Sequence, residues 1–209
     1  MFLDGAQREA FVVKVENHLS AVRSFTATFQ QEKKLAIFKD VVHSNGVLAF
    51  QAPDLIRWEI REPFRSILIV AGNSVGKFEF MGAQRRALQL GRGSDLVLVV
   101  MERIRQLFVG RFDRNEYVIE AAELPAPTVR LTPKGGRLTQ LLHIELRFTP
   151  SLDGVETVTI SERAGDSTVM RFKQVARDQS FVQGTFSSTD PIELDARGVA
   201  SQPATKPSK

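Results

Sequence analysis

The hydrophobic positions near the start of the chain recur at the spacing of an α-helix. Apolar side chains stand three or four residues apart from Phe11 onward, and charged residues occupy most positions between them. Such a stripe is typical of a helix that packs one face against a core. We therefore expect a first helix of about five turns. Its apolar stripe comprises Phe11, Val12, Val15, Leu19 and Val22.

Between residues 24 and 90 the spacing of the apolar positions changes to two. This alternation, with short turn sequences such as Ser44-Asn45-Gly46 and Gly72-Asn73 between the runs, predicts an antiparallel meander. One face of its sheet is expected to be apolar and aromatic, and the other polar enough to stand in water. The residues assigned to the apolar face include Phe25, Ile56, Trp58, Ile67 and Ile69.

Residues 94–109, SDLVLVVMERIRQLFV, predict a second long helix. Ser94 can cap this helix, and its stripe includes Val97, Val100 and Met101. The first half of the segment is apolar on every side, which a surface helix does not need. We therefore expect this helix to be buried on more than one side or to touch an apolar ligand.

Alternating strands resume after residue 127 and continue past residue 170. The order of helix, many strands, helix and many strands predicts an α+β fold with a single antiparallel β-sheet. Two or three helices cannot cover the whole apolar face of some ten flat strands, so we expect a strongly curved sheet, an incomplete β-barrel, with the helices over its concave face. Residues 1–194 form this one domain, and residues 195–209 are expected to be a disordered polar tail.

The composition adds few constraints and excludes several classes of site. The net charge is +4 and the isoelectric point about 9.6, but the basic residues are spread out without interleaved aromatics, so we expect no nucleic-acid partner. The absence of cysteine excludes disulfides and thiolate chemistry. No apolar run suits a membrane-spanning helix. The first residues lack the features of a signal peptide, so the protein is either cytoplasmic or was separated from such a peptide.

No motif in the sequence indicates catalysis or metal binding. Residues 72–77, GNSVGK, lack the spacing of a phosphate-binding loop, and Phe78 continues a strand where a helix should begin. The three histidines do not stand at ligand spacing, so no metal site and no cofactor are expected. Glu59 and Glu62 could perform acid–base chemistry but are more simply the solvated side of a strand. We expect that the protein is not an enzyme.

The supply of aromatic residues favours an apolar interior. The chain has 15 Phe, one Trp and one Tyr. Phe has no polar group that needs a partner, so a curved sheet lined with it can enclose a dry cavity for acyl chains. The alternative is a solid Phe-rich core without room for a ligand, and the pattern alone leaves both open.

Several segments, in order and spacing, resemble the outer-membrane lipoprotein carrier (LolA-like) family. LSAVRSFTATFQQ, from Leu19, is similar to the end of the family's first helix and its first strand. GVLAF, followed by APDLIRWE, is similar to its most recognisable segment. The late GDST and RF sequences, Phe186 and Asp190-Pro191 match its closing strands. The resemblance runs from about Leu19 to Ile192 and marks the chain as a divergent member.

The resemblance implies an incomplete barrel whose helices form a lid over a hydrophobic cavity. It implies a periplasmic monomer that shields the acyl chains of lipoproteins on their way to the outer membrane, without a cofactor. The implied partners are the acylated cargo, an inner-membrane release complex and an outer-membrane acceptor. By alignment, the acyl-binding residues would be Leu19, Val22, Phe25, Ile56, Trp58, Ile67, Ile69, Val97, Val100 and Met101.

One position departs from the family pattern. The arginine that latches the lid in the well-known carriers is replaced by Ala52, so the latch is absent or supplied by Arg57 or Arg61. This departure leaves room for a related lipid as cargo. An alternative is a sensor or interaction module on the same fold that binds lipidated proteins and regulates a partner.

Overall fold

The described part of the chain forms one helix of several turns and one large sheet. The computed structural model describes residues 2–37, 40–82, 84–88, 106–135, 140–195 and 198. The helix is α1 (Gly5–Ser20). The strands are β1 (Ser24–Lys34), β2 (Val41–Gln51), β3 (Leu55–Glu62), β4 (Ser66–Ala71), β5 (Ser74–Met81), β6 (Gln84–Leu88), β7 (Tyr117–Ala122), β8 (Thr128–Pro133), β9 (Leu141–Phe148), β10 (Val155–Glu162) and β11 (Ser167–Arg177).

Within the described residues the strands make a single 11-stranded antiparallel sheet. Its order is β6-β5-β4-β3-β2-β1-β11-β10-β9-β8-β7, so each half is a meander and the pairing of β1 with β11 joins the halves. The prediction of one large antiparallel sheet is confirmed. Of the predicted second helix, residues 94–105 lie outside the described residues, and residues 106–108 are helical.

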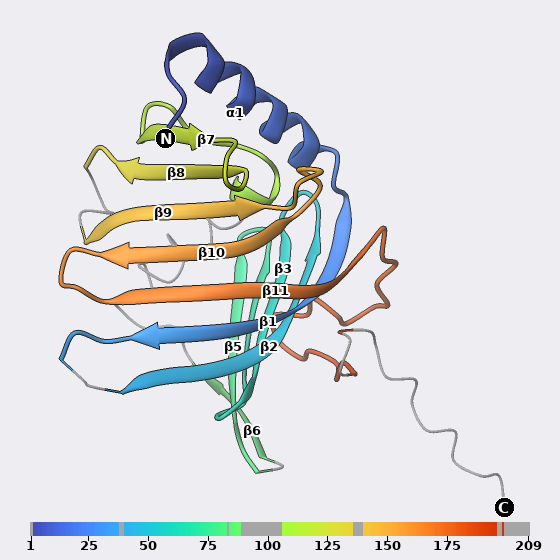
Figure 1. The fold of residues 1–209 in the computed structure, drawn as a ribbon. Helices are drawn as coiled ribbons and strands as arrows, with labels where there is room; N and C mark the ends of the chain where they lie inside the picture. Colours follow the sequence, from blue (N-terminus) through green and yellow to red (C-terminus); the bar gives the residue numbers. More distant parts are fainter. Residues whose placement is uncertain are drawn as a thin grey trace, which may run out of the picture.

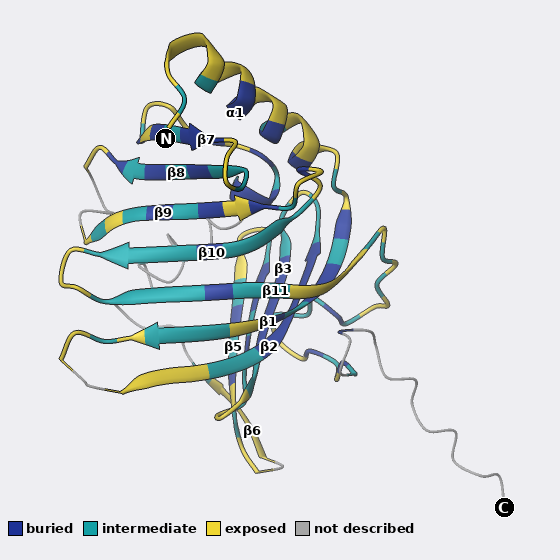
Figure 2. Cartoon of the chain, viewed as in Figure 1, coloured by how far each residue is buried: buried dark blue, intermediate teal, exposed yellow. Residues whose placement is uncertain are grey.

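The sheet curls around an apolar core. Figure 1 shows β7–β11 in front, β3 and β5 behind them at a steep angle, and α1 beside the β7 edge. Leu3 N donates to Ala121 O at 2.7 Å, which ties the start of α1 to β7. The buried stripe of α1 shares one core cluster with Trp58 of β3 and Leu146 of β9. Figure 2 shows this burial along the strands and on one side of α1.

Gly46 lies inside a strand and not in the turn that the sequence predicted. It pairs with Ile60 of β3 on one side and with Phe29 of β1 on the other. A Cβ atom at Gly46 would stand 2.0 Å from Glu59 O and 2.6 Å from the ring of Phe29. The glycine therefore permits a close approach of two strands, which the chain uses to pack Phe29 inside the curl.

Residues 178–195 form the C-terminal segment, and from residue 185 on this segment covers the outer face of β3–β6. Arg57 donates to Ile192 O at 2.6 Å and to Thr185 O at 3.3 Å, and Arg85 donates to Pro191 O at 2.9 Å. A Cβ atom at Gly76 would stand 2.1 Å from Ser188 O. Beyond this segment, Gly198 is buried against Val47 and Thr26, and the rest of the predicted tail lies outside the described residues.

Arg57 and Glu59 are buried under this segment, so the expectation that Glu59 is solvated is wrong. Their side chains are 0% and 1% exposed, and Arg57 Nη2 lies 2.7 Å from Glu59 Oε2. Arg65 donates to the other oxygen of Glu59 at 3.0 Å. Burial lowers the pKa of Arg57 below its ordinary value, and Glu59 opposes that change. Burial of this pair is tolerated because each charge has an opposite charge beside it and the hydrogen-bonding groups have partners.

Candidate functional site: an apolar pocket closed by an ion pair

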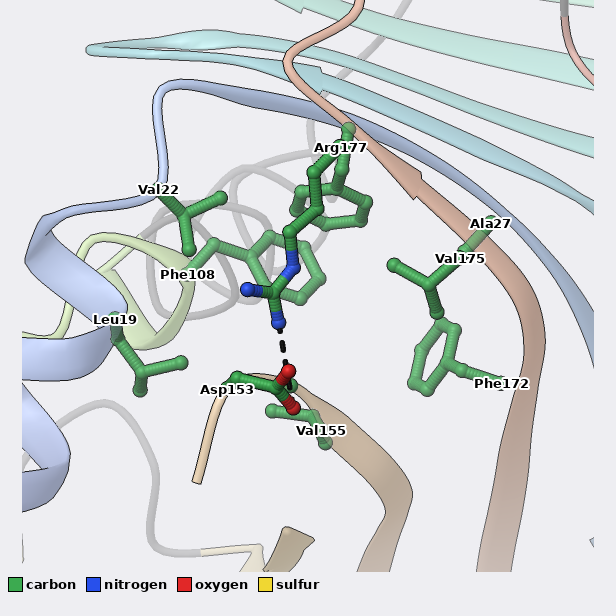
Figure 3. A pocket seen from close by; sticks show the side chains of 11 residues that line it. Leu19, Val22, Ala27, Phe108, Asp153, Val155, Phe172, Val175 and Arg177 are labelled. Carbon is green, nitrogen blue, oxygen red and sulfur yellow. Dashed lines mark ion pairs between the residues drawn. The ribbon is translucent and has the colours of Figure 1, made fainter. Parts of the chain in front are cut away.

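An apolar pocket of about 40 Å³ opens where α1 meets β1. Leu19 comes from the last turn of α1, Val22 from the connection after it, and Phe25 from the start of β1. Val22 N donates to Leu19 O at 3.0 Å, so the connection folds back sharply. The remaining lining residues are Ala27, Phe108, Asp153, Gly154, Val155, Phe172, Val175 and Arg177. Figure 3 labels all of these except Gly154 around the pocket. We call this the outer pocket.

A second apolar cavity, of about 20 Å³, lies deeper in the core. Trp58, Leu107, Leu146, Val158 and Met170 line it. Phe108, Val155 and Phe172 line both this inner cavity and the outer pocket. These three side chains are therefore the partition between the two spaces.

The interior around the partition is closely packed. Phe108 makes an edge-to-face contact with Phe25 at 5.4 Å between ring centroids, and it lies 5.7 Å from Phe50. Phe29 lies 4.7 Å from Trp58. Together the two spaces have room for only a few water-sized groups. An acyl chain can enter only if Phe108 or its neighbours move.

The mouth of the outer pocket carries an ion pair. Arg177 Nη2 lies 3.5 Å from Asp153 Oδ1, and Figure 3 shows the guanidinium reaching across the pocket. The other lining residues within the described part of the chain are uncharged. Thr149 Oγ1 donates to Asp153 at 2.5 Å and, with Ser151 and Arg177, keeps the pKa of this carboxyl below its ordinary value of 3.8. The carboxylate is therefore ionised and held in its turn.

Arg114 connects α1 to the loop that follows residue 109. It donates to Glu9 Oε1 and to Glu16 Oε2, each at 2.8 Å. These carboxylates raise the pKa of Arg114, and Glu16 is the main cause. Glu16 also accepts a hydrogen bond from Phe112 N at 3.1 Å. This cluster fixes the position of α1 over the core.

The structure brings together part of the set predicted from the sequence. Leu19, Val22 and Phe25 line the outer pocket, Trp58 lines the inner cavity, and Ile56 belongs to the core cluster around them. Val97, Val100 and Met101 lie outside the described residues.

The placement of Ile67 and Ile69 on the apolar inner face is wrong. They pair with Glu59 and Arg57, so they point to the outer face. There they form a separate cluster with Phe78, packed against Phe186 of the C-terminal segment. The inner positions of β4 belong to Leu68 and Val70.

Arg57 and Arg61 do not latch a lid over the inner face in the described part of the chain. Arg57 binds Glu59 and carbonyl groups of the C-terminal segment, and Arg61 donates to Leu194 O at 3.2 Å and to Asp195 O. Both therefore fasten the C-terminal segment to the outer face. In the described residues, the ionic contact that holds α1 comes from Arg114.

Sequence reasoning missed Val155, Phe172 and Arg177 as residues of the site. The alternation of Met170 and Phe172 along β11 was a usable signal, because both face the core. Arg177 is the last residue of β11 and lies beyond a shift in the register between β1 and β11. The alternation along the strand therefore does not indicate its face, and its place at the pocket follows from its pairing with Phe25.

The described residues contain no cluster of side chains suited to a metal ion. Among them, no helix has the length and apolar character that crossing a membrane requires.

Comparison with known proteins points to one family. The sequence profile of "Outer membrane lipoprotein carrier protein LolA" matches residues 20–189. An outer-membrane lipoprotein carrier protein from Pseudoalteromonas translucida (strain TAC 125) is 20% identical over 194 residues, 87% of this chain and 85% of the relative.

Solved structures share the fold at low sequence identity. A putative outer membrane lipoprotein-sorting protein domain from Vibrio parahaemolyticus has a TM-score of 0.50 and 8% identity, over 88% of this chain and 97% of its own. MucB has a TM-score of 0.50 and 14% identity, over 88% of this chain and 63% of its own. The resemblance read from the sequence is confirmed: the chain belongs to the outer membrane lipoprotein carrier protein LolA family.

Proposed function

We propose that this protein carries the acyl chains of lipoproteins, or of a related acylated lipid, through the periplasm. It shields the chains between the curled sheet and its helices and releases them towards the outer membrane. It acts as a monomer, receives its cargo from an inner-membrane release complex and passes it to an outer-membrane acceptor. The activity needs no cofactor and no covalent step.

One observation supports this proposal above the others: two neighbouring apolar spaces are separated by a partition of three side chains. The outer pocket begins at Leu19, Val22 and Phe25, and the inner cavity ends at Trp58. Movement of Phe108, which is contributed by the helical turn at 106–108, would join them into one channel. Each buried methylene would then contribute about 0.8 kcal/mol.

The test is native mass spectrometry of protein purified without detergent. We expect bound species whose masses correspond to acylated molecules. Val22→Glu, which places a charge in the outer pocket, should abolish their retention. Val13→Glu makes the same change at a 42% exposed position of α1 and should leave retention unchanged. Protein free of acyl ligands, and unable to take them up from vesicles, would refute the proposal.

A second candidate function is a sensor or interaction module that binds lipidated proteins and regulates a partner. The small volume of the two cavities favours it, because a filled interior is suited to a protein that works through its surface. A stable complex with a partner protein that persists in Val22→Glu would support this alternative over carriage.

A further inference from the structure

Among the described residues that line the outer pocket, Arg177 is the one cation. Its position follows from pairing: Arg177 lies opposite Phe25 in the β1–β11 ladder, and cross-strand neighbours share a face. The side chain is therefore directed to the apolar side, where Figure 3 shows it beside Phe108 and Val22. Its side chain is 35% exposed, so the guanidinium is accessible from solvent.

The ion pair that occupies Arg177 is a loose one. The 3.5 Å between Arg177 Nη2 and Asp153 Oδ1 exceeds the 2.7–2.9 Å of a charge-assisted hydrogen bond. Asp153 is held elsewhere, since its carboxylate accepts from Thr149 Oγ1 and its own N–H donates to the same atom at 3.1 Å. These contacts hold Asp153 in its turn, and at 3.5 Å its carboxylate leaves the donor fork of the Arg177 guanidinium incompletely used.

We propose that Arg177 binds the anionic headgroup of a single-chain amphiphile whose tail enters the outer pocket. The headgroup is a carboxylate or a phosphate, because these match the fork of arginine in a bidentate manner. The anion displaces Asp153 from Arg177, and the tail passes Phe108 towards Trp58. This inference rests on the proposed function, since it needs an interior that accepts acyl chains.

The arrangement separates the two parts of such a ligand in space. As far as the structure describes them, the walls behind Arg177 are uncharged, and Leu19, Phe25 and Phe172 give the tail an apolar surface. An amphiphile of the same chain length with a neutral headgroup would leave Arg177 with Asp153 and gain only the apolar contacts. The outer pocket is therefore expected to distinguish amphiphiles by the charge of their headgroups.

Trp58 provides the measurement. It is the one tryptophan of the chain and lines the inner cavity, so its fluorescence reports a tail that has passed the partition. The probes are stearic acid with a nitroxide label in mid-chain and its methyl ester, added to the full chain below their aggregation concentrations. We expect the acid to quench Trp58 and to bind about tenfold more tightly than the ester or better.

Three variants test the assignment to Arg177. Arg177→Gln should reduce the ratio of acid to ester affinity to about one, and Asp153→Asn should raise it, because the competing carboxylate is gone. Arg171→Gln is the matched control: Arg171 pairs with Glu32 on the outer face and should leave the ratio unchanged. Displacement of the label by unlabelled stearate or by lysophosphatidic acid identifies which anion binds better, and either one supports the proposal.

Two results would overturn the inference, and only the second of them would also overturn the proposed function. Equal affinities for acid and ester in the wild type, or a ratio unchanged by Arg177→Gln, refute the role of Arg177 and leave the acyl-binding interior intact. Failure of both probes to quench Trp58 refutes the acyl-binding interior itself, and the role of Arg177 is then refuted with it.

Discussion

Arg57 and Trp58 are consecutive residues of β3 whose side chains leave the sheet on opposite faces. Trp58 lines the inner cavity, whereas Arg57 lies 2.7 Å from Glu59 beneath the C-terminal segment. The same short strand therefore contributes to the apolar interior and to a buried ionic cluster on the outer face.

Glu59→Gln should lower the free energy of unfolding by about 3–5 kcal/mol, because it leaves the buried charge of Arg57 without its counter-ion. Urea denaturation followed by Trp58 fluorescence measures the change. Glu32→Gln removes the partner of Arg171 at an exposed pair and should cost less than about 1 kcal/mol. Equal losses in the two variants would contradict the importance of burial.

Gly76→Ala should loosen the C-terminal segment, since the added methyl group would stand 2.1 Å from Ser188 O. Overpacking of this kind costs about 1–3 kcal/mol. Hydrogen exchange should show faster exchange of the amides between residues 184 and 195, with β7–β10 unaffected. Ser74→Ala, at an exposed position of the same strand, should change nothing. Unaltered protection of the segment in Gly76→Ala would refute the contact.

Thr149→Val should raise the pKa of Asp153 towards its ordinary value, because the Thr149 hydroxyl is the main cause of the lowered pKa. A carboxyl whose pKa is lower in the folded state stabilises the fold above its unfolded pKa. This contribution disappears as the pH falls through the folded value. In both proteins the loss begins near the unfolded value of 3.8 as the pH falls. In the variant the lost contribution should be smaller, and its loss should be complete at a higher pH than in the wild type.

Carboxyl-carbon NMR titration of Asp153 measures the change directly. Thr157→Val, on the neighbouring β10, leaves the turn of Asp153 intact and should leave this titration unchanged. A pKa that is the same in Thr149→Val and in the wild type would rule out the hydroxyl as its cause.

Arg114→Met should free α1 without unfolding the protein. The Arg114 side chain is 41% exposed, so the loss of its pairs with Glu9 and Glu16 should change global stability by less than about 1 kcal/mol. Amides of α1 should exchange faster, and uptake of a labelled acyl chain should accelerate because α1 borders the pocket mouth. Arg147→Met removes an exposed pair with Glu156 on β9 and β10 and serves as the control. Slower or unchanged uptake would show that α1 does not limit entry.

The sequence predicted most of the sheet because alternation is a local signal. Phe25, Phe29, Ile56 and Trp58 face the core as expected. The same signal could not orient β4. Its sequence SILIVA is apolar at every position except the first, so the pattern does not show which face of the strand points to the core. Register with β3 decides this, and register depends on distant residues.

Burial of the ionic cluster could not be predicted from β3 alone. Arg57 and Glu59 stand at the polar positions of an alternating strand, which normally meet water. They are buried because residues 185–195, more than a hundred positions later, cover them and supply carbonyl acceptors. Arg177 was missed for the same reason, since its neighbour Phe25 lies at the other end of the chain.

The pairing of β1 with β11 also constrains the order in which this protein can assemble. Ser24 begins β1, Arg177 ends β11, and all the other strands of the sheet lie between them in sequence. Every other pair in the sheet joins two strands that are consecutive in the sequence. Each meander can collapse early, but the seam between them must wait until the last strand has been synthesised, and closing so long a loop is slow. Until then both Phe-rich surfaces stand open, so a nascent chain of this protein is expected to depend on chaperones.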